Sequence, residues 1–109
     1  IYNMMNMQAI LKQAQMMQKK MEETQSKLAA EEVSGTSGGG LVEVVLNGKF
    51  ELKKIHIDPS LLADGDAQML EDMVVAAHLQ AYKKADEKMS AGMKDVTGGM
   101  NLGGLKLPF

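Results

Sequence analysis

The feature that most constrains this chain is a long helical pattern near its N-terminus. From residue 4 to about residue 32, apolar and small residues recur at spacings of three and four, which place them on one stripe of a helix. These residues are Met7, Ile10, Ala14, Met17, Met21, Thr24 and Leu28. A helix of about 27 residues is roughly 40 Å long, which exceeds the diameter of the domain that such a chain can build. We therefore expect part of this helix to project from the domain or to pack on another chain.

The middle of the chain has the pattern of a β-sheet. Residues 33–40 are rich in glycine and hydroxyl side chains, and we expect a weak strand that runs into a flexible turn. A phosphate-binding loop is not expected there, because the P-loop spacing and the helix that follows such a loop are both missing. Residues 41–46 and 49–57 predict two antiparallel strands joined at Asn47-Gly48, a strong hairpin signal.

The returning strand carries apolar residues in two different phases. Phe50 and Leu52 share one face, but Ile55 and Ile57 do not continue the same alternation. Either the faces exchange, or a bulge near residues 53–54 restores the register. Because apolar side chains occur in both phases, we expect both faces of the sheet to be covered, one by helices and the other by a second copy of the chain.

A second long helix is predicted in the C-terminal half. Residues 58–62 (Asp-Pro-Ser-Leu-Leu) indicate a tight turn or a single helical turn, after which Asp64 or Asp66 can cap a helix that runs to about Met93. Its expected buried side consists of Leu70, Met73, Val74, Ala77, Ala81 and Ala85. From residue 96 onward the chain is too rich in glycine to form an element. We therefore expect a single domain over residues 1–95 and a flexible tail over residues 96–109.

The composition excludes several classes of protein. The 109 residues include no cysteine, which rules out disulfides, thiolate nucleophiles and cysteine-ligated zinc. No run approaches the roughly 18 apolar residues of a membrane span, and the N-terminus has no secretory signal. We therefore expect a cytoplasmic protein that does not interact with a membrane.

Motifs for catalysis or cofactor binding are missing from the sequence. His56 and His78 are the plausible general bases near neutral pH, but no motif links them, and metal-binding spacings and nucleotide fingerprints do not occur. Eleven methionines could form a soft-metal site or an adaptable groove for a partner. Met7, Met17 and Met21 lie on the helical stripe, however, which favours a role in packing. We predict a protein that is not an enzyme and that has no cofactor, metal or small-molecule substrate.

Charge is distributed unevenly along the chain. Twelve basic and 14 acidic side chains give a net charge of -2. Residues 4–21 hold three lysines and no acid, whereas residues 58–72 hold five acids and no base. Every basic residue is a lysine, and the commonest specific contact to guanine is a bidentate arginine. If the chain binds DNA, it should therefore contact the backbone more than the bases.

Several segments together resemble the YbaB/EbfC family of bacterial nucleoid-associated proteins over nearly the whole chain. They are residues 12–18 (KQAQMMQ), 40–42 (GLV), Asn47-Gly48, 55–62 (IHIDPSLL), 70–77 (LEDMVVAA) and the final Lys-Leu-Pro-Phe. The resemblance implies an α+β subunit of order α-β-β-β-α, in which a three-stranded antiparallel sheet lies between two long helices. It also implies a homodimer that forms through the sheets and projects its helices like the arms of tweezers.

The resemblance further implies that the helical arms bind double-stranded DNA in the nucleoid. On matching positions, the candidate DNA-binding residues are Lys12, Gln15, Lys19 and Lys20 of the first helix and Lys83, Lys84 and Lys88 of the last.

We therefore predict a homodimer that binds duplex DNA mainly through lysine–phosphate contacts and affects nucleoid organisation or gene expression. The alternative is a protein-protein interaction module whose methionine-rich arms clasp a partner protein. An arm surface that is apolar where DNA requires lysine would favour this alternative.

Overall fold

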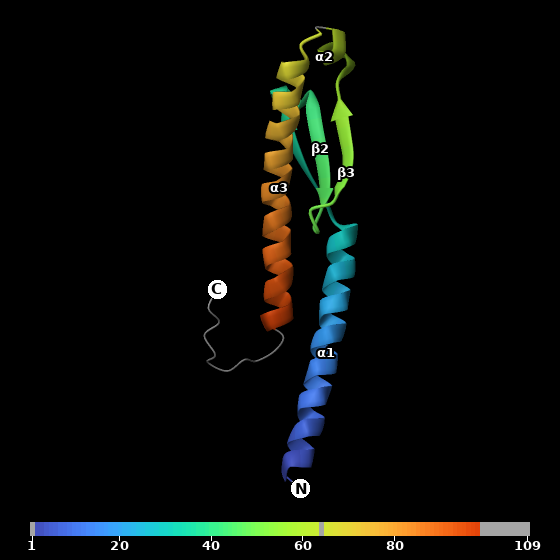
Figure 1. The fold of residues 1–109 in the computed structure, drawn as a ribbon, viewed down its shortest axis with the longest axis vertical. Helices are drawn as coiled ribbons and strands as arrows, with labels where there is room; N and C mark the ends of the chain where they lie inside the picture. Colours follow the sequence, from blue (N-terminus) through green and yellow to red (C-terminus); the bar gives the residue numbers. More distant parts are fainter. Residues whose placement is uncertain (1, 64, 99–109) are drawn as a thin grey trace.

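A small antiparallel sheet and two long helices make up the computed structural model, which describes residues 2–63 and 65–98 (Figure 1). The elements are α1 (Tyr2–Ala30), β1 (Glu32–Ser37), the short 3-10 helix η1 (Gly38–Gly40), β2 (Val42–Asn47), β3 (Leu52–Ile57), α2 (Pro59–Ala63) and α3 (Ala67–Gly98). The strands follow one another in the order β1-β2-β3, and both pairs are antiparallel. The predicted α-β-β-β-α order is confirmed. The molecule is elongated, with extents of 76 × 24 × 17 Å.

The core lies between α3 and one face of the sheet. Alternate residues of β2 (Val42, Val44 and Leu46) point toward α3 and are buried, as period-two alternation requires. Small residues one turn apart on α3 receive them: Ala77, Ala81 and Ala85. The approach is closest at Gly35 of β1, where an added Cβ would collide with the carbonyl oxygen of Ala77. Only glycine permits α3 to lie this near to the strand.

Side chains of α3 also close the outer edge of β1. The Thr36 amide donates a hydrogen bond to Oε1 of Gln80 at 2.7 Å, and Nζ of Lys84 donates to the carbonyl oxygen of Ser34 at 2.8 Å. The Ser37 hydroxyl donates to the carbonyl oxygen of Met73 at 2.6 Å. An exposed strand edge is a template for pairing with another chain, and this edge is occupied.

The returning strand contains the bulge that the sequence left as one of two alternatives. Val45 pairs with Lys54, but Leu46 pairs with Leu52, so Lys53 is the extra residue. Ile55 and Ile57 thereby return to the face that α3 covers, opposite Val44 and Val42. The apolar side chains of β3 therefore lie on one face, and the premise that this strand is apolar on both faces is wrong. The far face carries Ser34, Thr36, Glu43, Val45, Lys54 and His56.

The hairpin turn differs from the expected two-residue Asn-Gly turn. Asn47 still pairs with Glu51 through a 3.0 Å backbone hydrogen bond, so the loop spans residues 48–50. Phe50 takes the left-handed conformation, with φ of 66°, at the position that glycine usually fills in a three-residue hairpin loop. The side chain of Asn47 holds this loop, because its Oδ1 accepts from the amides of Lys49 (2.9 Å) and Glu51 (3.0 Å).

The same turn is fastened to the C-terminal end of α1. Nδ2 of Asn47 donates to the carbonyl oxygen of Ala29 at 3.1 Å, and the Gly48 amide donates to that of Leu28 at 2.8 Å. A Cβ on Gly48 would lie 2.9 Å from the same Leu28 oxygen. Gly48 is thus required by the close approach of a helix distant in sequence, which a local turn pattern does not reveal.

Aspartates begin the two later helices. The Ser60 amide donates to Oδ1 of Asp58 at 2.9 Å, and the Met69 amide donates to Oδ1 of Asp66 at 3.0 Å. Hydrogen bonds from the side chain and backbone of Ser60 hold the pKa of Asp58 below its ordinary value. The predicted helical turn after Asp58 and the cap at Asp66 are confirmed, whereas Asp64 lies outside the described residues.

α3 is longer than the sequence indicated. It continues to Gly98, beyond the expected end near Met93 and past the boundary that we placed at residue 95. Val96, which we assigned to the tail, is 1% exposed. The rest of the expected tail, residues 99–109, lies outside the described residues.

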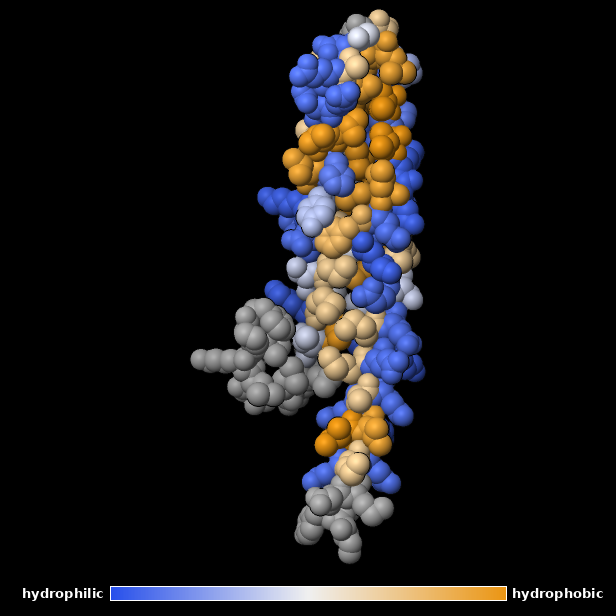
Figure 2. Space-filling view, viewed as in Figure 1, coloured by the Kyte–Doolittle hydropathy of each residue, from blue (hydrophilic) through white to orange (hydrophobic). Residues whose placement is uncertain are grey.

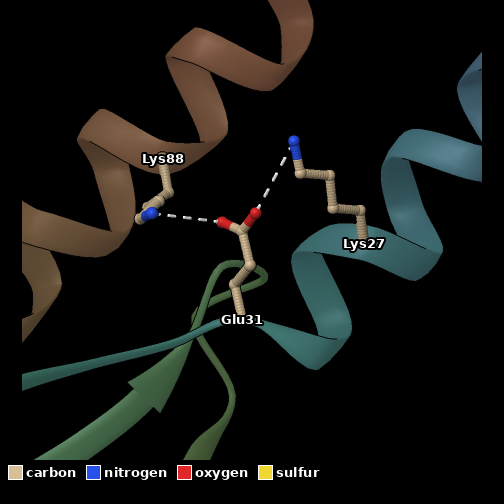
Figure 3. Close-up of polar contacts among 3 residues, drawn as sticks. All are labelled: Lys27, Glu31 and Lys88. Carbon is tan, nitrogen blue, oxygen red and sulfur yellow. Dashed lines mark ion pairs between the residues drawn. The ribbon is translucent and has the colours of Figure 1, made fainter.

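α1 is held at its C-terminal end and projects beyond α3 (Figure 1). Thr24 and Leu28 are buried, and Cγ2 of Thr24 lies 3.1 Å from where a Cβ on Gly92 of α3 would be. Next to this contact, Glu31 lies between Lys27 (3.8 Å) and Lys88 of α3 (3.4 Å), as Figure 3 shows. Residues 6–16 are all exposed. The predicted projection of the first helix is confirmed. Within residues 2–63 and 65–98, no helix is long and apolar enough to cross a membrane.

Gly35→Ala is expected to destabilise the fold by about 3 kcal/mol, because the new methyl group collides with the α3 backbone and must displace the helix. Urea unfolding of both proteins measures the change. Thr36→Ala, one residue away and exposed, is the control and should leave the midpoint nearly unchanged. Equal stability of Gly35→Ala and wild type would contradict the close packing.

Asn47→Ala should lower the free energy of unfolding by about 2 kcal/mol, since partly buried backbone groups of the hairpin and α1 lose their hydrogen-bond partner. It should also raise the pKa of Glu51, which is held low first by the hydrogen bond from Asn47 and then by the charge of Lys53. A lowered pKa stabilises the fold at pH values above the ordinary carboxyl pKa, and that contribution disappears as the pH falls through the lowered value. NMR titration of the Glu51 carboxyl checks the shift; an unchanged pKa would contradict it.

Candidate nucleic-acid interface

The first four candidate residues lie on the projecting part of α1, residues 6–20, which we call the arm. Lys12, Gln15 and Lys19 lie within about 60° of one another around the helix. Lys20 lies about 100° around the helix from Lys19. All four are exposed. Lys12 and Lys19 are seven residues apart, which separates them by roughly 10 Å along the helix. The arm therefore presents a row of positive charge that has no packing role.

The candidate lysines of α3 are placed differently from those of the arm. Lys83 is exposed, but Lys84 donates to Ser34 of β1 and Lys88 pairs with Glu31. Two of the three candidates on this helix thus already stabilise contacts within the subunit.

Acidic residues also surround the charge of α3. Asp86 and Glu87 lie three and four residues after Lys83, on its side of the helix, and both are exposed. On α1 the nearest acids are Glu22 and Glu23, one turn beyond Lys19. Positive charge is therefore least offset around Lys12 on the outer arm.

A further basic group lies on the hairpin, where sequence reasoning assigned no binding role. Lys49, Lys53, Lys54 and His56 are all exposed, and Glu51 stands among them as a carboxylate of lowered pKa. The Lys53-Lys54 pair was visible in the sequence, but we interpreted it only in terms of register. Lys49 lies in the turn at the base of α1, and Lys53, Lys54 and His56 follow along β3 away from it.

The two histidines do not form a catalytic pair. His56 lies on the far face of the sheet, opposite Glu43, whereas His78 lies on α3, with its ring 6.2 Å from that of Tyr82. The sheet separates them. Across the described part of the chain, no group of three or more His, Asp or Glu side chains could hold a metal ion.

A broad hydrophobic surface occupies the upper half of the molecule in Figure 2, over α3 and the sheet. Its exposed residues form what we call the α3–β3 patch: Leu52, Ile55, Val75, Leu79 and Tyr82. The ring of Tyr82 lies 4.8 Å from that of Phe50, so this side of α3 faces the β3 side of the sheet. α3 packs over β1 and β2 and leaves β3 uncovered.

A second hydrophobic surface follows the arm, where Figure 2 shows a smaller cluster near the end of α1. Met7, Ile10, Ala14 and Met17 form this apolar stripe, which continues the face that packs on α3 at Thr24 and Leu28. Ile10 is 63% exposed. The arm thus has Lys12 and Lys19 on one side and a largely uncovered apolar stripe on the opposite side.

Known proteins are similar in sequence to this chain over nearly its full length. A nucleoid-associated protein of Granulibacter bethesdensis is 49% identical over 107 residues, which cover 97% of this chain and all of that protein. A nucleoid-associated protein of Gluconacetobacter diazotrophicus is 50% identical with the same coverage.

A solved structure shares the fold. The crystal structure of an uncharacterised protein from Helicobacter pylori matches with a TM-score of 0.71 and 28% identity, covering 78% of this chain and 89% of that one. The family model of the YbaB/EbfC DNA-binding family matches residues 4–100. This chain therefore belongs to the YbaB/EbfC DNA-binding family.

Proposed function

We propose that this protein is a non-enzymatic component of the bacterial nucleoid that binds duplex DNA as a homodimer, mainly through lysine–phosphate contacts from its α1 arms. The observation that carries the proposal is the exposed lysine row of a helix that leaves the domain. The relatives that are named nucleoid-associated proteins support this cellular role.

The chemistry of the arm suits the DNA backbone. Lysine is a flexible point charge that pairs with phosphate without reading a base, and Gln15 can donate to a phosphate oxygen. Lys12, Lys19 and Lys20 have no intramolecular ion pair among the described residues, so phosphates need not compete with carboxylates for them. We expect weak, salt-sensitive binding with little sequence preference.

We assign the lysines of α3 unequal roles. Lys83 is free to contact DNA, whereas Lys84 and Lys88 mainly hold α3 to β1 and to the end of α1. Their loss should weaken DNA binding indirectly, through the position of the helices.

The difference between the two edges of the sheet supports dimerisation. Side chains of α3 close the β1 edge, while β3 is exposed over five of its six residues and adjoins the α3–β3 patch. β3 is an uncovered strand that carries the exposed side chains of Leu52 and Ile55, and a second copy of the chain can cover this surface. Two subunits joined there would place two arms on one particle, which increases DNA affinity through effective concentration.

The apolar stripe supports a second candidate function, that of a protein-interaction module. Met7, Ile10 and Ala14 of the stripe are exposed, and they lie on the side of the arm opposite Lys12 and Lys19. A partner protein could therefore use the arm without displacing DNA.

Leu79→Glu should convert the homodimer to a monomer at micromolar concentration, because a buried, unpaired carboxylate opposes association. Sedimentation equilibrium measures the mass. Met16→Glu is the matched control, since Met16 on α1 is 63% exposed and Leu79 is 62% exposed. A monomeric wild type, or a Leu79→Glu variant that still dimerises, would contradict the proposed interface.

Replacing Lys12, Lys19 and Lys20 together by Gln should weaken binding to a fluorescent mixed-sequence duplex. The slope of log affinity against log salt should also decrease by about one for each lysine that contacts a phosphate. The control replaces Lys49, Lys53 and Lys54 by Gln and removes the same charge. A larger loss in this control would move the site to the hairpin, and no binding by the wild-type protein at low salt would reject DNA binding.

A further inference from the structure

We propose that the C-terminal segment of the same chain, residues 99–109, docks along the apolar stripe of the arm. The stripe consists of Met7, Ile10, Ala14 and Met17, and it is the continuation of the α1 face that α3 covers further along. α3 covers this face of α1 only along the part of α1 that α3 reaches. The segment that follows α3 in the chain would cover the rest of the face.

The end of α3 places the segment at the start of the stripe. The two helices are antiparallel (Figure 1), and Gly92 lies beside Thr24 and Leu28. Gly98 is six residues further, about 9 Å along α3, and so lies beside about residue 20 of α1. From that point the chain needs only to continue in the same direction to run along the stripe.

The length and composition of the segment fit this path. Eleven extended residues span up to about 36 Å, whereas the distance along α1 from Met21 to Met7, at the far end of the stripe, is roughly 21 Å. Five of the eleven residues are large and apolar: Met100, Leu102, Leu105, Leu107 and Phe109. Leu105, Leu107 and Phe109 alternate with other residues, which places them on one side of an extended chain. Gly103, Gly104 and Pro108 oppose a helix there.

Docking would leave the opposite lysine row accessible. Lys12, Gln15 and Lys19 lie across the helix from the stripe, so the segment and DNA would occupy different sides. The covered arm would then expose less apolar surface to the solvent.

Disulfide trapping tests the docking in the absence of DNA. No native thiol interferes, because the natural chain has no cysteine. Ile10→Cys combined with Leu105→Cys should oxidise at least tenfold faster than Met16→Cys combined with Leu105→Cys. Ile10 and Met16 are both 63% exposed, but Met16 lies about 120° away around the helix. The product should run at the mass of one chain on a non-reducing gel.

Equal rates for the two pairs would overturn the proposal, and so would a fast product at twice the chain mass, which would assign the stripe to a second copy. Both substitutions in α1 are at exposed positions and should not disturb folding. A thermal melt equal to that of wild type for each reduced variant verifies this.

Discussion

The close approach of α3 to β1 is the contact on which the rest of this structure depends. Gly35 allows the backbone of the helix to touch the strand, and Ala77, Ala81 and Ala85 allow it to lie flat on β2. Because α3 is centred over β1 and β2, Gln80 and Lys84 reach the outer edge of β1 and close it. For the same reason β3 remains uncovered. One packing contact thus closes one edge of the sheet and leaves a hydrophobic surface at the other.

The position of α3 also determines what α1 can do. α3 supports only the C-terminal part of α1, through Thr24, Leu28 and the ion pairs of Glu31 (Figure 3). Residues 6–16 of α1 are exposed, so their side chains are not constrained by packing. A helix in this situation can carry a lysine row and an apolar stripe on opposite sides, and each can serve a different contact. This division accounts for a DNA-binding subunit whose net charge is -2.

Most of the secondary structure could be predicted from the sequence, because periodicity and capping are local. The stripe of α1, the alternation of β2 and the cap at Asp66 are examples. The three-residue loop could not be predicted, because Asn47 and Gly48 donate hydrogen bonds to Ala29 and Leu28 of a helix that is distant in the sequence. The polar far face was missed because the bulge at Lys53 changes the phase of Ile55 and Ile57. For the candidate site, the sequence could name the lysines of α3 but not the partners of Lys84 and Lys88, which lie about 50 residues or more away in the chain.

An NMR titration of the isotopically labelled protein with a short duplex at low salt tests whether α1 carries the DNA-binding surface, because it locates the DNA on the subunit. We predict that the largest backbone amide shifts fall on the arm around Lys12, Lys19 and Lys20, with smaller changes near Lys83. Shifts that concentrate instead on the hairpin around Lys49, Lys53 and Lys54, and leave the arm unchanged, would contradict the central claim that α1 carries the DNA-binding surface.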